Sequence, residues 1–476
     1  MRSLKNRFAI PVLIAALGFI AAGRVTAQTF TTLHSFTTAD GAYPKASLVL
    51  SGNTLYGTAE LGGSSGSGTV FAINTDGTSF TNLHTFTAVT QNTNSDGVNP
   101  FAGLLLLGST LYGTAANGGI SGSGTVFAIN TNGTSFTNLH AFTSLPVART
   151  NSDGANPLAG LILSSNTLYG TAGNGGIGGH GSVFAVNTDG SGFTNLYSFM
   201  SLAYPEGGLV LSSNILFGMT GLGGSSTNGM VFAVNVDGTA FTTLHNFGAW
   251  SGVPTNMDGA RPSGGLILSG STLYGTTVYG GSGGRGTVFK VDTDGTNFLV
   301  LHNFTGPASN PTNTDGAQPY SDLVLCGSTL YGTASSGGTS GKGTLFAVNT
   351  NGTGFTNLHS FTGGSDGANP YAGLILSGNT LFGTAQGGGT SGVGTVFSLS
   401  LPVPQLSITP FGPNVILTWP TDFAGFDYSG YTLQSTTNLV SSGVWSTNLP
   451  SPVVVNGQNT VTNPISGTQQ FFRLSQ

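Results

Sequence analysis

Hydrophobic and polar positions alternate over short stretches along nearly the whole chain. Short runs rich in Val, Ile, Leu, Phe and Tyr are separated by Gly, Asn, Asp and Ser, and glycine alone numbers 78. Alternation of this kind between turn formers predicts short β-strands. Helix signals are nearly absent beyond the N-terminal segment. The chain is therefore expected to be all-β.

The strand pattern repeats. Each period contains a GLILSG-like, a TLYGTA-like and a GTVFAVNTDG-like segment, followed by one of the type FTxLHxF. The FTxLHxF segments begin at Phe30, Phe80, Phe136, Phe193, Phe241, Phe298 and Phe355. Four antiparallel strands in a period of about 50 residues are typical of a propeller blade. The sequence predicts a seven-bladed β-propeller over residues 28–401; an open solenoid is the alternative, but it would need atypical capping repeats.

The order of strands within a blade predicts how the ring closes. Tight turns join GLIL to TLYG and VFAVN to FTNLH, so a blade runs from an inner GLIL strand to an outer FTNLH strand. Residues 30–36 then precede any inner strand, whereas the last repeat, residues 373–399, lacks an outer one. We predict that the N-terminal strand completes the last blade, which would leave no exposed edge.

Residues 1–27 have the pattern of a signal peptide. Basic residues come first, an apolar run follows over residues 8–22, and Val25 and Ala27 are small residues before a cut at Ala27-Gln28. The apolar run is shorter than the roughly 20 residues that a membrane span needs. We expect export to the cell surface or beyond, with no transmembrane span after cleavage.

Residues 402–476 depart from the repeat. A Pro-Val-Pro linker is followed by alternating stretches at 415–420, 431–434 and 471–474, which predict a small β-sandwich. We interpret Trp419 and Trp445 as core side chains rather than as a ligand platform.

Charge and cysteine content exclude some partners. The predicted signal peptide contains four of the eleven basic residues, so its removal would leave a chain with seven basic and sixteen acidic side chains. This balance argues against nucleic acid and anionic membranes as partners. Cys326 is the only cysteine, so no internal disulfide is expected, and we interpret it as a buried small residue. We expect a monomer whose partner is an extracellular glycan or protein.

An Asp-Gly-x-x-Pro segment precedes most inner strands, on the face of the ring that carries the long loops. Its acidic residues are Asp40, Asp96, Asp153, Asp258, Asp315 and Asp366. One interpretation is a rim that binds cations, with calcium as the candidate, or a polyhydroxylated ligand. The other is that Asp caps a turn and Pro stiffens the strand start, and repetition in nearly every blade favours it. No cofactor is predicted.

Six of the seven histidines occupy one slot of the outer strand: His34, His84, His140, His245, His302 and His359. One histidine per blade is too dispersed for a zinc site. The fourth repeat has Tyr197 in this slot and also lacks the Asp-Gly. Our hypothesis is that each His forms a hydrogen bond within the nearby connector, to its Asp, as a structural latch.

A few residues break the repeat and could form an asymmetric site. His180 lies in a glycine loop, and the other candidates are Arg149, Arg261, Arg285, Lys290 and Lys342, together with Asp153 and Asp258. No nucleophile–base pair is evident, and the only glutamates, Glu60 and Glu206, lie in non-equivalent places. The glycine loops lead into strands rather than helices, which excludes a phosphate loop. No catalytic residue is predicted.

The run LYGTAxxGGxxGxGTVFAVNTDGTxFTNLHxF resembles the tandem GloVer repeat of exported bacterial proteins in the choice-of-anchor group. The resemblance covers all seven units and implies export and repeated β-structure, without a settled activity. At fold level the chain is similar to kelch and WD propellers. The NVILTWP run and the later YTLQS strand resemble the early strands of fibronectin type III modules.

Three functions are compatible with these patterns. The leading one is a non-catalytic binding or scaffold module that uses the long-loop rim. The alternatives are a polysaccharide-acting enzyme with its site at the central channel and a structural surface protein without a specific ligand. Unlike polar groups converging from neighbouring blades would favour an enzyme.

Overall fold

The computed structural model describes residues 28–146, 149–249, 256–306, 313–423, 426–428, 431–437, 445–447, 449–464 and 469–475. The predicted signal peptide lies outside these residues. Every regular element within them is a β-strand, which confirms the all-β expectation. Nowhere in the described ranges is there a helix with the length and apolar character needed to cross a membrane.

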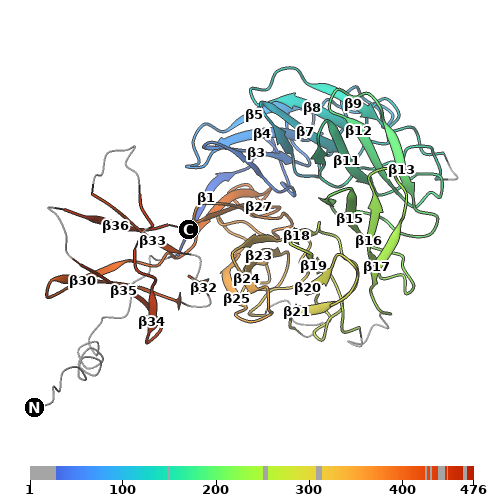
Figure 1. Ribbon diagram of the computed structural model, residues 1–476. Coiled ribbons are helices and arrows are strands. Elements are labelled where there is room, and N and C mark those ends of the chain that lie inside the picture. Colours follow the sequence, from blue (N-terminus) through green and yellow to red (C-terminus); the bar gives the residue numbers. More distant parts are fainter. Residues whose placement is uncertain are drawn as a thin grey trace, which may run out of the picture. The chain divides into compact units, whose positions relative to one another are not determined.

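Residues Thr29–Leu401 form one compact unit, and the chain from Pro402 onward belongs to a second. The first unit contains seven antiparallel sheets of four strands each, which follow one another along the chain (Figure 1). This repetition of four-stranded sheets is consistent with a β-propeller.

The first strand of each sheet is a short apolar run that ends at a tight turn. These strands are β2 (Val49–Ser51), β6 (Leu105–Leu107), β10 (Ile162–Ser164), β14 (Val210–Ser212), β18 (Ile267–Ser269), β22 (Val324–Cys326) and β26 (Ile375–Ser377). Cys326 ends β22 and is only partly buried, which corrects its interpretation as a buried residue. All three residues of this short strand are half-buried.

The second and third strands are almost completely buried. The second strands are β3 (Thr54–Ala59), β7 (Thr110–Ala115), β11 (Thr167–Ala172), β15 (Ile215–Thr220), β19 (Thr272–Thr277), β23 (Thr329–Ala334) and β27 (Thr380–Ala385). The third strands are β4 (Thr69–Asn74), β8 (Thr125–Asn130), β12 (Ser182–Asn187), β16 (Met230–Asn235), β20 (Thr287–Asp292), β24 (Thr344–Asn349) and β28 (Thr395–Ser400). The glycine inside each second strand makes room for a third-strand phenylalanine: a Cβ on Gly57 would lie 2.6 Å from Cζ of Phe71.

The fourth strand carries the FTNLH sequence. In six sheets it is β5 (Thr81–Thr85), β9 (Thr137–Ala141), β13 (Thr194–Ser198), β17 (Thr242–Asn246), β21 (Leu299–Asn303) and β25 (Thr356–Ser360). In the seventh sheet the fourth strand is β1 (Thr29–Ser35), which pairs antiparallel with β28 from Thr29↔Ser400 to Ser35↔Thr395. The N-terminal strand therefore completes the sheet of the last repeat.

Neighbouring sheets share one apolar core. Phe127 of the second sheet, for example, packs with Tyr56 and Val70 of the first. The same core forms between the last sheet and the first, where Phe71 packs with Phe382 and Val396.

A buried hydrogen bond accompanies most of these cores. A second-strand threonine donates to a backbone carbonyl of the next repeat at 3.0–3.3 Å, from Thr58, Thr114, Thr171, Thr276, Thr333 and Thr384. The bond from Thr384 reaches Ala46 of the first repeat at 3.2 Å, so it joins the last sheet to the first. The fourth sheet has Met219 at this slot, buried to 1% exposure.

The second unit contains one four-stranded sheet and smaller pairings. The sheet consists of β29 (Ser407–Phe411), β30 (Asn414–Pro420), β35 (Gln458–Pro464) and β34 (Val453–Val455); the pairs are β31 (Asp422–Phe423) with β32 (Phe426–Asp427) and β33 (Thr432–Thr436) with β36 (Phe471–Ser475). Trp419 is 1% exposed and packs with Leu417, Leu433 and Val461. The core of this unit therefore includes residues of the four-stranded sheet and of the β33–β36 pair. Trp445 is only partly buried and lies under the guanidinium of Arg473.

Candidate functional site

The six aspartates of the predicted acidic rim are each bound to a histidine. The His Nε2 to Asp Oδ2 distances are 2.9–3.2 Å in the pairs His34–Asp40, His84–Asp96, His140–Asp153, His245–Asp258, His302–Asp315 and His359–Asp366. The hydrogen bond expected from the sequence is therefore present in all six repeats that have both residues. In the same six repeats the backbone N–H of the residue after the next Phe donates to the same carboxylate, as Thr143 does to Asp153 at 3.0 Å.

Each histidine ring also contacts the next sheet. It stacks on the first phenylalanine of that sheet's fourth strand, with centroids 3.5–4.0 Å apart, as in His84–Phe136 and His34–Phe80. Tyr197 makes the same contact with Phe241 at 4.1 Å, which explains how an aromatic ring substitutes for histidine there. Phe30 of β1 stacks on His359 at 4.0 Å.

Burial and hydrogen bonding act in opposite directions on these groups. For Asp96, Asp153 and Asp315, burial would raise the pKa, but hydrogen bonds from the paired histidine and from the following threonine together hold the pKa below its ordinary value. Burial lowers the pKa of His34 and His359, although their aspartates oppose this. Burial thus favours the neutral imidazole at His34 and His359, and hydrogen bonding favours the carboxylate at Asp96, Asp153 and Asp315.

These contacts already use the hydrogen-bonding capacity of every one of the six aspartates. The side chains of Asp96 and Asp153 are only 6% and 7% exposed, whereas those of Asp40 and Asp258 are 28% and 25% exposed. Across the described part of the chain, no three His, Cys, Asp or Glu side chains lie where they could hold one metal ion. The contacts favour the structural interpretation of the Asp-Gly segments over a cation-binding rim.

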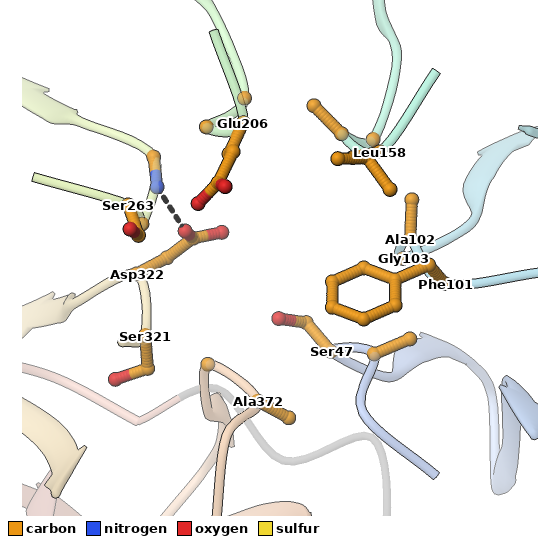
Figure 2. Close-up of a pocket in the computed structure, with 18 of the residues that line it drawn as sticks. Ser47, Phe101, Ala102, Gly103, Leu158, Glu206, Ser263, Ser321, Asp322 and Ala372 are labelled. Carbon is orange, nitrogen blue, oxygen red and sulfur yellow. Dashed lines mark hydrogen bonds between the residues drawn. The ribbon is translucent and has the colours of Figure 1, made fainter. Parts of the chain in front are cut away.

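A different place brings the repeats together. A cavity of about 540 Å³ is lined by the same segment of every repeat, the residues just before the first strand (Figure 2). Arg261 lines this cavity, whereas the other predicted rim residues, including His180 and Arg285, are not among its lining residues. Arg261 is 41% exposed, which marks where the cavity meets solvent.

The backbone that lines this cavity has the same unusual conformation in every repeat. The residue before the proline has a left-handed backbone in every repeat, with φ between 53° and 59°, at Tyr43, Asn99, Asn156, Tyr204, Arg261, Gln318 and Asn369. A non-glycine residue in this region is strained and needs support. Its N–H donates at 2.7–3.3 Å to a glycine-loop carbonyl of the preceding repeat, and the proline packs against the last glycine of that loop.

The residue after the proline differs in every repeat but one pair. It is Lys45, Phe101, Leu158, Glu206, Ser263, Tyr320 and Tyr371 in chain order, and all seven line the cavity. The flanking positions, by contrast, are mostly Ala and Gly. The cavity wall therefore combines basic, acidic, hydroxyl, aliphatic and aromatic side chains from one register of the repeat.

Polar groups gather on one side of the cavity. Figure 2 shows Glu206, Ser263 and Asp322 close together, opposite Phe101, Ala102 and Leu158. Burial raises the pKa of Glu206, and the nearby Ser263 hydroxyl and Arg261, whose Nη2 lies 3.7 Å from Oε1 of Glu206, oppose this by less. Burial also raises the pKa of Asp322, which accepts a hydrogen bond from the backbone N–H of Gly265.

Aromatic side chains and a lysine complete the wall. Tyr320 and Tyr371 lie with ring centroids 4.8 Å apart, and burial raises the pKa of both hydroxyls. Lys45 forms an ion pair with Glu60 at 2.8 Å, and its Nζ lies 5.0 Å from the centre of the Phe101 ring. Lys45 is thus already neutralised by the chain itself.

Sequence reasoning missed most of this site. It noted Glu206 only as an unplaced glutamate and did not consider Asp322, Lys45 or Tyr320. The available signal was variation at one register, the residue after the proline, and at the register of Asp322, where the other repeats have Gly or Ser. Aligning the seven repeats with one another would have found both positions.

The chain belongs to the Gloeobacter/Verrucomicrobia repeat family. The family model matches three overlapping stretches, residues 18–202, 90–257 and 253–411. This confirms the resemblance to GloVer-type repeat proteins. None of the curated proteins is similar enough to this chain to count as a match.

Several solved structures are similar in fold at low sequence identity. An oligogalacturonate lyase in complex with manganese has a TM-score of 0.47 and 11% identity over 80% of this chain and 98% of its own. A puromycin-hydrolyzing peptidase of Mycobacterium tuberculosis has a TM-score of 0.46 and 13% identity over 82% and 61%. A chain of the nidogen/laminin complex has a TM-score of 0.37 and 12% identity over 62% and 90%. Similarities this low carry no conclusion about activity.

Proposed function

We propose that the chain is an exported, non-catalytic binding module whose ligand occupies the cavity at the centre of a seven-bladed propeller. The observation that carries this proposal is the chemical variety of the cavity wall. The residue after the proline lines the cavity in all seven repeats, and its type changes from repeat to repeat. A purely structural repeat would have no need for a Lys, a Glu, a Ser and three aromatic rings there.

The closed ring is part of the proposal. Four contacts that join one repeat to the next also join the seventh to the first: the shared core, the threonine hydrogen bond, the N–H of Tyr43 to the Val393 carbonyl at 2.8 Å, and Pro44 against Gly394. The stacking of Phe30 on His359 makes β1 equivalent to any other fourth strand. A single cavity lined by all seven repeats fits this geometry.

The histidines and aspartates are structural in this proposal. Each His–Asp pair ties the fourth strand to its connector, while the histidine ring packs on the next sheet. They latch the blades together and leave binding to the cavity. In this proposal the long-loop rim is not itself the ligand site.

The cavity wall suits a small polyhydroxylated ligand such as the end of a glycan. One side offers the Phe101 ring and Leu158 to an apolar face, and the other offers carboxyl and hydroxyl groups to ligand hydroxyls. A few placed polar groups in a largely apolar concavity are typical of small-molecule sites.

A glycan panel tests this function. The chain from Gln28 onward is expected to bind at least one oligosaccharide, and Phe101→Ala should weaken that binding about tenfold, the loss of about 1.4 kcal/mol. The matched control is Ile120→Ser, since Ile120 is 74% exposed and other repeats have Ser at that slot. Equal binding by both variants, or no binding to any glycan, contradicts the proposal.

A polysaccharide-acting enzyme is the second candidate. The observation in its favour is that Glu206 and Asp322, two carboxyl groups with raised pKa, line the same cavity, and such groups can serve as general acids. The two functions differ in turnover. New reducing ends released from a bound oligosaccharide, and lost in Glu206→Gln, would favour the enzyme.

A further inference from the structure

Asp322 is an acidic residue at a register where no other repeat has one. The equivalent residues are Ser47, Gly103, Gly160, Gly208, Gly265 and Gly373. The repeat fold therefore does not require a carboxyl group there. Asp322 also lines the cavity, so its side chain is placed where a ligand would lie.

The carboxyl group of Asp322 has no cationic partner among the described side chains. Oδ1 accepts from the backbone N–H of Gly265, and Figure 2 shows the other oxygen directed away from that bond. The groups that act on its pKa are burial, which raises it, and two backbone N–H groups, of Gly265 and of Asp322 itself, which lower it by less. Both cations of the cavity wall are engaged elsewhere, Lys45 with Glu60 and Arg261 with Glu206.

Ser263 also lies in this part of the cavity wall. Its side chain is 8% exposed and its hydroxyl lowers the pKa of the neighbouring Glu206, yet Oγ makes no hydrogen bond of acceptable geometry within the described residues. Buried hydroxyl groups normally have a partner, because an unpaired one loses the hydrogen bonds that water would give it. Glu206, Ser263 and Asp322 come from three successive repeats and so form one polar corner of the cavity (Figure 2).

An ionised carboxylate without a counter-charge is unfavourable in a partly enclosed site. A ligand with an ammonium group would supply the missing charge and could donate three hydrogen bonds. Ligand hydroxyls could pair with Glu206, and the opposite wall, with Phe101, would accept an apolar sugar face.

Building on the proposed function, we propose that the polar corner formed by Glu206, Ser263 and Asp322 selects glycans that carry a free amino group, with Asp322 as the residue that binds the ammonium. The ligand class is a hexosamine whose nitrogen is not acylated. The amine gives the charge that Asp322 lacks, and the ring hydroxyls satisfy the remaining groups.

Two matched ligands test this proposal on the chain from Gln28 onward. Titration calorimetry at neutral pH would compare glucosamine oligomers with N-acetylglucosamine oligomers of the same length. We expect the free-amine form to bind at least tenfold more tightly. Lysine methyl ester serves as the non-sugar amine and should bind at least tenfold more weakly than the glucosamine oligomer.

Variants then assign the preference to Asp322. Asp322→Gly restores the residue of most other repeats and should remove the preference for the free amine, and Asp322→Asn should do the same while keeping the side chain's size. Asp294→Asn is the control with the same change in net charge, since Asp294 lies in an exposed hairpin turn where other repeats have Asn132 and Asn351. Circular dichroism of each variant shows whether it is folded, and a misfolded Asp322→Gly leaves Asp322→Asn to decide.

The outcomes separate this proposal from the one on which it rests. Tighter binding of the acetylated oligomer, equal binding of both, or a preference that survives Asp322→Asn overturns the amine selection while glycan binding stands. Equal binding of lysine methyl ester overturns the glycan part of the inference. If no oligosaccharide of any kind binds, the proposed function itself fails.

Discussion

Replacing Phe30 by alanine tests whether the N-terminal strand is a full member of the ring. Phe30 stacks on His359 at 4.0 Å, meets the Phe361 ring edge-on at 5.7 Å and lies 5.3 Å from Phe397. Phe136, at the same slot of β9, has matching contacts: His84 at 3.9 Å, Phe86 at 5.9 Å and Phe127 at 5.4 Å. Two side chains in the same environment should cost the same to remove.

The size of the effect follows from burial. Truncating a fully buried phenylalanine costs about 3–5 kcal/mol, and since both rings are only partly buried we expect about 2–3 kcal/mol for each. Spread over the unfolding entropy of the repeat unit, this is a fall in Tm of about 3 °C. Thermal unfolding followed by circular dichroism measures both variants under one protocol.

The comparison has a clear negative outcome. If Phe136→Ala lowers Tm as expected and Phe30→Ala leaves it unchanged, β1 does not contribute to the ring in solution, and the closure is refuted. A loss of Tm several times larger for Phe30→Ala would instead mean that the whole strand detaches once its aromatic anchor is removed.

Further outcomes test other parts of the fold. Deleting residues 28–36 should expose the edge of β28 and convert the monomer to aggregates on size-exclusion chromatography with light scattering; an intact monomer would count against closure by β1. Thr333→Val should cost about 1 kcal/mol, because the Thr333 hydroxyl donates to the Ala372 carbonyl in a buried bond of 3.0 Å; urea unfolding would show it, and an unchanged midpoint would mean that the bond adds no stability. The Tm should fall as pH drops from 7 to 3. Burial lowers the pKa of His34 in the folded chain, so below about pH 6.5 protonation favours the unfolded chain. The pKa of Asp96 is held below its ordinary value, so the stability that Asp96 contributes is present above about pH 4 and is lost as pH falls through that lowered pKa. A Tm that rises toward acid pH would contradict these directions.

Much of the fold could be predicted because each strand pattern occurs seven times in the sequence. The four segments of a period became the four strands of a sheet, from β2 to β5 and onward, and the family match confirms the repeat. The hydrogen bond between the histidine of the fourth strand and the aspartate of its connector could also be predicted. The signal was that the fourth repeat, which has Tyr197 in place of the histidine, also lacks the aspartate. The predicted strand boundaries of the second unit were less complete, because its short strands lack a repeat to compare.

The candidate site could not be found in the same way. The acidic rim was one candidate, although its repetition in nearly every blade favoured a structural role, and each of its six carboxyl groups is bound to a histidine. Asp322 and Glu206 are 116 residues apart in the sequence and belong to different repeats. Glu206 is the first residue after its proline, whereas Asp322 is the third residue after its own. Nothing local to either residue indicates that they face one cavity.

The sequence by itself determined the local elements, because strand periodicity, turn glycines and aromatic slots act over a few neighbouring residues. It also determined which repeats resemble one another and where the pattern departs. Only the tertiary structure decided which departures meet: the residue after each proline lines a common cavity, and that convergence depends on how all seven sheets pack. The candidate site arises because the packing of the sheets brings together three side chains from different repeats: Glu206, Ser263 and Asp322.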